Sequence, residues 1–178
     1  IAYDLSKDYS VTVADINQET LTVLAEKYKQ KTVYADFSNL IDLKKILKEY
    51  DLIISAVPGF MGFKVLKTII ESKKNVVDIS FFPENALDLH DLAEKNNVTA
   101  LVDFGVAPGL GNILFGHYDT LMKIDKYTCY VGGLPKIKEK PFEYKAPFSP
   151  IDVIEEYTRP ARLFQNGNII VKEPLTEI

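Results

Sequence analysis

The sequence predicts an α/β fold: a doubly wound parallel sheet followed by part of a second, α+β domain. Two observations support this prediction. Up to residue 104, five short apolar runs alternate with four amphipathic stretches, which is typical of parallel strands joined by crossover helices. After residue 104 the chain becomes rich in glycine, proline and aromatic residues, which indicates a change of architecture. We therefore expect a first domain at 1–114 and a second at 115–178.

The first domain contains the elements expected of such a sheet. The predicted strands cover 10–15, 31–36, 51–57, 75–80 and 98–104. The predicted helices cover 17–30, 40–50, 60–74 and 85–97. In the first helix a core-facing stripe is predicted at Leu21, Leu24, Ala25 and Tyr28. Asn17 is a suitable N-cap for that helix. Because the strands are nearly continuously apolar, we expect helices on both faces of the sheet.

Residues 1–9 have the pattern of the last turns of a helix. In a Rossmann-like fold, a strand and a glycine-rich phosphate-binding turn precede such a helix, and the sequence as given contains neither. We expect both to lie outside it. We also expect residues 1–178 alone to bind a dinucleotide poorly.

Asp15 ends the first predicted strand, where a carboxylate holds the adenosine ribose in dinucleotide-binding folds. Ile16 and Asn17 follow it, so no arginine or lysine is present there to pair with a 2′-phosphate. The sequence therefore favours NAD over NADP as cofactor. Asp36 and Phe37 end the next strand and are candidates to flank the adenine, with a core position as the alternative for Phe37.

Ligands of open parallel sheets bind beyond the carboxyl ends of the strands. The third and fourth strands end in two candidate groups of cofactor-binding residues: Ala56, Val57 and Pro58, and then Asp78. Aspartate is also common wherever a strand meets a helix cap, so capping is the alternative for each acidic strand end.

Composition and charge exclude several classes of protein. The formal net charge of −4 and the pI near 5.3 argue against binding to nucleic acid or an anionic membrane surface. No apolar run approaches the roughly 18 residues of a membrane helix.

Cys129 is the single cysteine, so an internal disulfide is excluded and a reducing, cytoplasmic setting is expected. No histidine or acidic grouping has metal-ligand spacing. His90 is interpreted as a surface residue.

The second domain is less regular. A strand is predicted over 126–135, with Cys129 as a small core residue in it. The prolines that follow rule out a long regular element, and Gln165–Asn168 (QNGN) indicates a hairpin turn. His117 is a candidate base, with a structural role as the alternative.

Four motifs carry a resemblance to a known family: AVPGFMG at 56–62, VDFGVAPGLGN at 102–112, VGGLP at 131–135 and YKAPFSPIDVIEEYTRPAR at 144–162. With them the chain resembles the saccharopine dehydrogenase family, most of all its lysine 6-dehydrogenase branch. The resemblance implies a homo-oligomeric enzyme that oxidises the amine-bearing carbon of a small amino acid, lysine or saccharopine, with NAD(P). It places the nicotinamide near 56–59 and 78–80.

In that reaction a base removes the ammonium proton and a cation holds the substrate carboxylate. Asp103 is the candidate to face the substrate, and Arg159 and Lys145 are candidate clamps. Tyr144 and Glu84 are candidate polar contacts.

Each of these assignments has an alternative. Asp103 could cap the turn at Gly105, Arg159 could pair with Glu155 or Glu156, and Lys145 could be solvated. The alternative function is a non-catalytic NAD-sensing or assembly protein that keeps the same fold.

Overall fold

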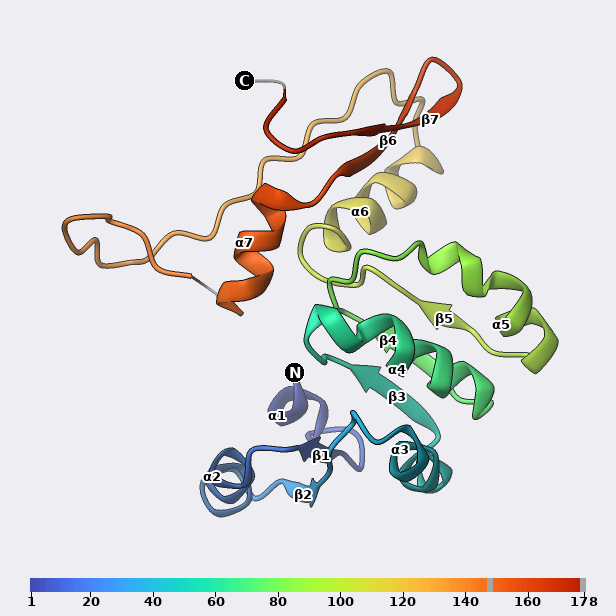
Figure 1. Cartoon of the computed structure of the whole chain (residues 1–178), viewed down its shortest axis with the longest axis vertical. Coiled ribbons are helices and arrows are strands. Elements are labelled where there is room, and N and C mark those ends of the chain that lie inside the picture. The colour runs from blue at the N-terminus through green and yellow to red at the C-terminus, as the bar shows by residue number, and fades with distance from the viewer. Residues whose placement is uncertain (147–148, 177–178) are drawn as a thin grey trace.

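The computed structural model describes residues 1–146 and 149–176. The first half contains α1 (Ala2–Leu5), β1 (Thr12–Asp15), α2 (Gln18–Tyr28), β2 (Lys31–Tyr34), α3 (Leu40–Ile46), η1 (Leu47–Glu49), β3 (Leu52–Ser55), α4 (Gly59–Glu71), β4 (Asn75–Asp78), η2 (Ala86–Leu89), α5 (His90–Asn96) and β5 (Ala100–Leu101). The second half contains α6 (Leu110–Asp119), α7 (Pro150–Thr158), β6 (Ala161–Gln165) and β7 (Asn168–Lys172) (Figure 1).

The predicted alternation of strands and helices is confirmed in the first half. Each of the five strands and each of the four helical stretches is present, as is the short helix α1. Asn17 caps α2, because its side-chain oxygen accepts a hydrogen bond of 2.9 Å from Thr20 N. The predicted stripe on α2 is only partly buried: Leu21 lies in the core, whereas Tyr28 is 39% exposed.

The strands form two parallel groups. β1 pairs with β2, and β4 lies between β3 and β5. In the described part of the chain no strand ladder joins β1 to β3. The doubly wound order places one further strand between these two. The preceding strand expected from the sequence would take that place, and this stays a prediction.

The main core lies between β3–β5 and the helices α3, α4 and α5. Leu66, Ile69, Ile70 and Val76 are each 1% exposed there, and Ile53 packs against them. The opposite face of the same strands is open among the described residues, since Leu52 is 56% exposed and Ile54 39%. The expectation that helices cover both faces is therefore wrong for β3.

The strand predicted over 126–135 is not present. In the described part of the chain these residues join no strand ladder, although their composition favours a strand. Cys129 is exposed, so its predicted core position is also wrong. Its thiol lies beside the phenol of Tyr127 and raises the pKa of that group.

The hairpin turn is confirmed, and a helix is added before it. Asn166 and Gly167 join β6 to β7 and both have positive φ, 51° and 82°, as a type I′ turn requires. Helix α7 follows Ser149 and starts with Pro150 at its first position, a common helix start. No helix in the described residues is long and apolar enough to cross a membrane.

Candidate active site

A polar cluster lies at the carboxyl ends of β3 and β4. Asp78 is fully buried, and it is the register partner of Ser55 on the neighbouring strand. Asp78 Oδ1 accepts a hydrogen bond of 2.7 Å from Ser80 N. By distance and angle, three buried oxygens have no hydrogen-bond partner among the described residues: Asp78 Oδ2, Ser55 Oγ and Ser80 Oγ. The two hydroxyls nevertheless lie near enough to the Asp78 carboxyl to act on its pKa.

The environment of Asp78 favours its protonated form. Burial is the largest cause and raises the pKa of the carboxyl above its ordinary value, and the negative charge of Asp103 acts in the same direction. The hydroxyls of Ser55 and Ser80 and the backbone of Ser80 oppose this shift without cancelling it. Asp78 is thus a carboxyl that retains a proton more readily than an exposed aspartate does.

Asp103 follows β5 and lies beside Asp78. Its φ of 52° is left-handed, and the next residue, Phe104, donates its N–H to Asp78 O at 3.0 Å. The Asp103 side chain is exposed at this edge. Its backbone packs closely against Gly109 at the turn that begins with Gly105. The role of Asp103 toward a substrate stays a prediction.

Helix α7 brings residues of the second half to the same edge. Arg159 follows α7, lies 4.1 Å over the ring of Phe81 and donates a hydrogen bond of 3.4 Å to Phe81 O. It also pairs with Glu155 one turn earlier on the helix. The structure therefore contains the Arg159–Glu155 pair that was stated above as the alternative. Its role as a carboxylate clamp stays a prediction.

Asp152 on α7 faces the start of α4. Its side chain is buried, and Oδ1 has no hydrogen-bond partner within residues 1–146 and 149–176. It lies 3.1 Å from the point where a Cβ on Gly59 would stand. The same Cβ would be 1.9 Å from Phe81 O, so Gly59 is the residue that lets these segments meet.

Three predicted substrate contacts lie outside this cluster. Tyr144 and Lys145 line an open hollow of about 510 Å³ together with Pro135 and Lys136. This hollow belongs to the long segment between α6 and α7, which extends away from β3–β5 (Figure 1). Glu84 is exposed in the loop after β4. Their roles stay predictions.

Two of the residues predicted to bind the adenosine end cap the turns that they begin. Asp15 Oδ1 accepts a hydrogen bond of 2.7 Å from Asn17 N. Asp36 Oδ1 accepts one of 2.9 Å from Ser38 N, and hydrogen bonds from the side chain and backbone of Ser38 lower the pKa of Asp36. Ile16 is 57% exposed next to Asp15.

Two other predicted cofactor contacts belong to the core. Phe37 and Val57 both pack against the main core cluster, which is the alternative stated for Phe37. Ala56 and Pro58 are exposed on either side of Val57. They are the strand-end surface that remains accessible to a ligand.

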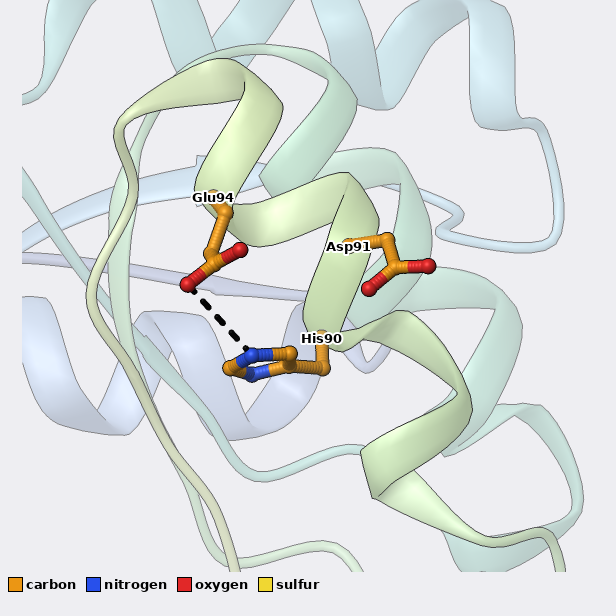
Figure 2. Close-up of side chains that lie close together, drawn as sticks. All are labelled: His90, Asp91 and Glu94. Carbon is orange, nitrogen blue, oxygen red and sulfur yellow. Dashed lines mark ion pairs between the residues drawn. The ribbon is translucent and has the colours of Figure 1, made fainter.

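His90, Asp91 and Glu94 gather on α5, where their potential ligand atoms lie within 4.8 Å of one another. Figure 2 shows His90 turned toward Glu94, with 3.4 Å between Nε2 and Oε1. All three are exposed on one seven-residue helix. The group is therefore a surface contact between His90 and Glu94, with Asp91 beside it. The surface position predicted for His90 is confirmed. His117 is also exposed, with its ring 5.3 Å from that of Tyr118.

Sequence reasoning did not single out Ser55 or Asp152, and it included Ser80 only as part of the strand end 78–80. Ser55 had a signal, since a small polar residue ends an otherwise apolar strand. Asp152 follows a Ser-Pro pair, a usual helix start. Its burial against Gly59 depends on a contact between distant segments, which no local pattern reports.

A parallel α/β domain with polar side chains gathered at the carboxyl ends of its strands is typical of the open α/β folds that bind ligands there, a class that includes dinucleotide-binding domains. The sequence model named saccharopine dehydrogenase NADP binding domain matches residues 1–101, and the one named saccharopine dehydrogenase C-terminal domain matches 105–178. The chain belongs to the saccharopine dehydrogenase family. The resemblance found in its motifs is confirmed.

Individual relatives agree with this assignment. The chain is 28% identical over 170 residues to the mitochondrial alpha-aminoadipic semialdehyde synthase of Rattus norvegicus, covering 90% of this chain and 18% of that protein. It is 25% identical over 169 residues to saccharopine dehydrogenase [NADP(+), L-glutamate-forming] of Saccharomyces cerevisiae, covering 91% and 38%. The structure of the apo L-Glu-forming saccharopine dehydrogenase from that yeast aligns with a TM-score of 0.71 and 25% identity, over 97% of this chain and 41% of the other.

The comparisons support some of the earlier predictions and leave others untested. The chain spans less than half the length of each of these relatives. A nicotinamide dinucleotide cofactor is supported, but the matching names carry NADP, so they do not support the predicted preference for NAD. The domain boundary near residue 115, the homo-oligomer and the cytoplasmic setting stay predictions.

Proposed function

We propose that the protein containing this chain is an oxidoreductase that transfers a hydride from the amine-bearing carbon of lysine or saccharopine to a nicotinamide dinucleotide. The observation that supports this most is the alignment of 97% of the chain with a saccharopine dehydrogenase structure at a TM-score of 0.71. The substrate, including the lysine 6-dehydrogenase branch, is part of the proposal.

The chemistry needs three things from the protein. The substrate amine must be neutral, so that its lone pair forms the C=N bond while the hydride leaves for the nicotinamide ring. A base must accept the proton that the ammonium group gives up. The substrate carboxylate must be held so that the reacting carbon meets the ring.

Residues at the carboxyl ends of β3–β5 suit these tasks. We place the nicotinamide against Ala56 and Pro58, and the substrate amine at the exposed carboxylate of Asp103. Asp78 lies behind Asp103, and its pKa is raised by burial and by the charge of Asp103. A carboxyl that keeps its proton there limits the negative charge of the pair. Arg159, already held by Glu155 and Phe81, is the proposed clamp.

The test is an activity assay on the protein in its natural length. It is supplied with NAD or NADP and with lysine, saccharopine or other amino acids, and reduced nicotinamide is followed by absorbance. Asp103→Asn is expected to lower kcat/KM by at least roughly 100-fold, the usual contribution of an acid–base group. Asp51→Asn is the matched control, because Asp51 is exposed at the opposite end of β3.

The alternative function gives a different result. A non-catalytic NAD-sensing or assembly protein would bind the dinucleotide without reducing it, whatever amino acid is supplied. The specific observation in its favour is that Arg159 is already paired with Glu155. If no amino acid leads to reduction of the nicotinamide while the dinucleotide still binds, this alternative is favoured.

A further inference from the structure

Helix α4 begins in a buried position at the carboxyl end of β3. Its N-cap is Pro58, and among the described residues no side-chain hydrogen bond caps the helix. The backbone N–H groups of a first helical turn have no acceptor within the helix and carry partial positive charge. Gly59 itself is buried, so its N–H is better served by an acceptor from the protein than by water.

Asp152 places a carboxylate at this helix start. It lies in the first turn of α7, and it is only 8% exposed. Its Oδ1 lies 3.1 Å from the point where a Cβ on Gly59 would stand. Since this oxygen has no hydrogen-bond partner in the part of the chain that the structure describes, the contact is one between a negative charge and the positive end of a helix. Such a contact is favourable, and it compensates for the burial of the carboxylate.

A second contact holds the other end of α7. Arg159 follows Asp152 by two helical turns, so it comes from the same face of the helix. Its guanidinium lies 4.1 Å over the ring of Phe81 and donates to Phe81 O. Phe81 O is also the atom that a Cβ on Gly59 would meet. Both ends of α7 therefore rest on the small area that Gly59 and Phe81 form.

We infer that Asp152 is a positioning residue for Arg159. The contact of its carboxylate with the start of α4 sets how α7 lies on the strand ends, and hence where the guanidinium meets the carboxylate of the substrate. This inference rests on the proposed function, since Arg159 is the proposed clamp. It gives a buried residue of the second half a role in binding the amino acid and none in binding the dinucleotide.

The test measures the two KM values of the protein in its natural length, with lysine, or with saccharopine if lysine is not oxidised. Asp152→Ala removes the acceptor. It should raise KM for the amino acid roughly tenfold, the effect of losing one helix cap, and leave KM for the dinucleotide within about twofold. Asp152→Asn keeps an acceptor oxygen that suits a helix start, so it should recover most of the affinity. Glu156→Ala changes an exposed carboxylate on the same helix and should leave both KM values unchanged.

A double-mutant cycle decides whether Asp152 acts through Arg159. In Arg159→Ala the clamp is absent, so adding Asp152→Ala should raise KM for the amino acid by less than about twofold more. If Asp152→Ala does not fold, Asp152→Ser takes its place in the cycle. Effects of the two substitutions that multiply would overturn the inference, because Asp152 would then act independently of the clamp.

Hydrogen exchange gives a readout that does not depend on turnover. The amides of Gly59, Phe60 and α7 should exchange roughly tenfold faster in Asp152→Ala and at the original rate in Glu156→Ala. If the unchanged protein oxidises an amino acid but neither the exchange rates nor KM respond to Asp152→Ala, the inference fails and the proposed function stands. If the unchanged protein oxidises neither lysine nor saccharopine, the proposed function fails, and the inference fails with it.

Discussion

Ser55 and Asp78 are register partners at the last positions of β3 and β4, and both side chains are buried. Along the same strands the pair before them is Ile54 and Val77, so the ladder changes from apolar to polar at its carboxyl end. A buried serine and a buried carboxyl contribute less to stability than apolar residues of similar size would. Their location, where ligands of parallel sheets bind, supports a functional reason for the change.

The pH dependence of stability tests the state of Asp78. Its pKa is raised above the ordinary 3.8, mainly by burial, so the folded protein holds a proton that the unfolded chain releases. Asp78 therefore lowers the free energy of unfolding as the pH rises from about 3.8 to its folded pKa. Asp78→Asn should lose this dependence and gain stability relative to the unchanged protein across that window. Urea unfolding between pH 4 and 8 measures it. A constant difference between the two proteins would contradict the prediction.

Local patterns were sufficient for the first half of the fold. Alternation of apolar runs with amphipathic stretches located β1–β5, and the side chain of Asn17 caps α2 as its chemistry predicts. In the second half, the positive φ angles of Asn166 and Gly167 form the predicted hairpin turn. The run around Cys129 has equally good β-forming residues but pairs with no strand in the described part of the chain. Strand formation there depends on a partner, which a sequence window does not contain.

The candidate site was predicted only in part for the same reason. Asp78 and Asp103 were found because strand ends can be read from the sequence. The meeting of Asp152, Gly59 and Phe81 depends on how α7 packs against segments about 70 to 90 positions earlier. Tyr144 and Lys145 were chosen by residue type, and the structure places them in a separate hollow.

The contact of Gly59 with Phe81 predicts a steric effect. A Cβ at Gly59 would lie 1.9 Å from the Phe81 carbonyl oxygen, which is backbone and cannot move aside easily. Gly59→Ala should lower the free energy of unfolding by about 1–3 kcal/mol. Gly116→Ala is the matched control, because Gly116 also lies in a helix and a Cβ there meets nothing within 4 Å. It should be neutral or raise stability by up to about 1 kcal/mol. Thermal or urea unfolding of both variants gives the answer, and similar behaviour of the two would refute the steric account.

Arg159 should couple energetically to Glu155. The pair is largely shielded from solvent, with side-chain exposures of 17% and 28%, and the guanidinium also contacts Phe81. Arg159→Ala should cost about 1–3 kcal/mol of unfolding free energy, and Arg159→Lys should recover only part of it because an ammonium does not stack on a ring as a guanidinium does. A double-mutant cycle with Glu155→Ala should give a coupling of about 0.5–3 kcal/mol.

Lys123→Ala is the control: it removes an exposed pair with Asp125 and should change the free energy of unfolding little. Additive effects at 155 and 159 would rule out the coupling.

Asp15 should set the choice between NAD and NADP. Among the described residues, Asn17 N engages only one of its carboxylate oxygens, so the carboxylate can accept from a ribose hydroxyl and would repel a 2′-phosphate. We therefore propose a preference for NAD, in contrast to the NADP in the names of the relatives. Asp15→Ser should weaken NAD binding roughly tenfold, as expected for one charge-assisted hydrogen bond, and should strengthen NADP binding.

Asp8→Ser, at an exposed position before β1, is the control for the Asp15 variant. Dissociation constants of both dinucleotides, measured on the protein in its natural length, decide the matter. Tighter binding of NADP by the unchanged protein would show that Asp15 does not control the choice.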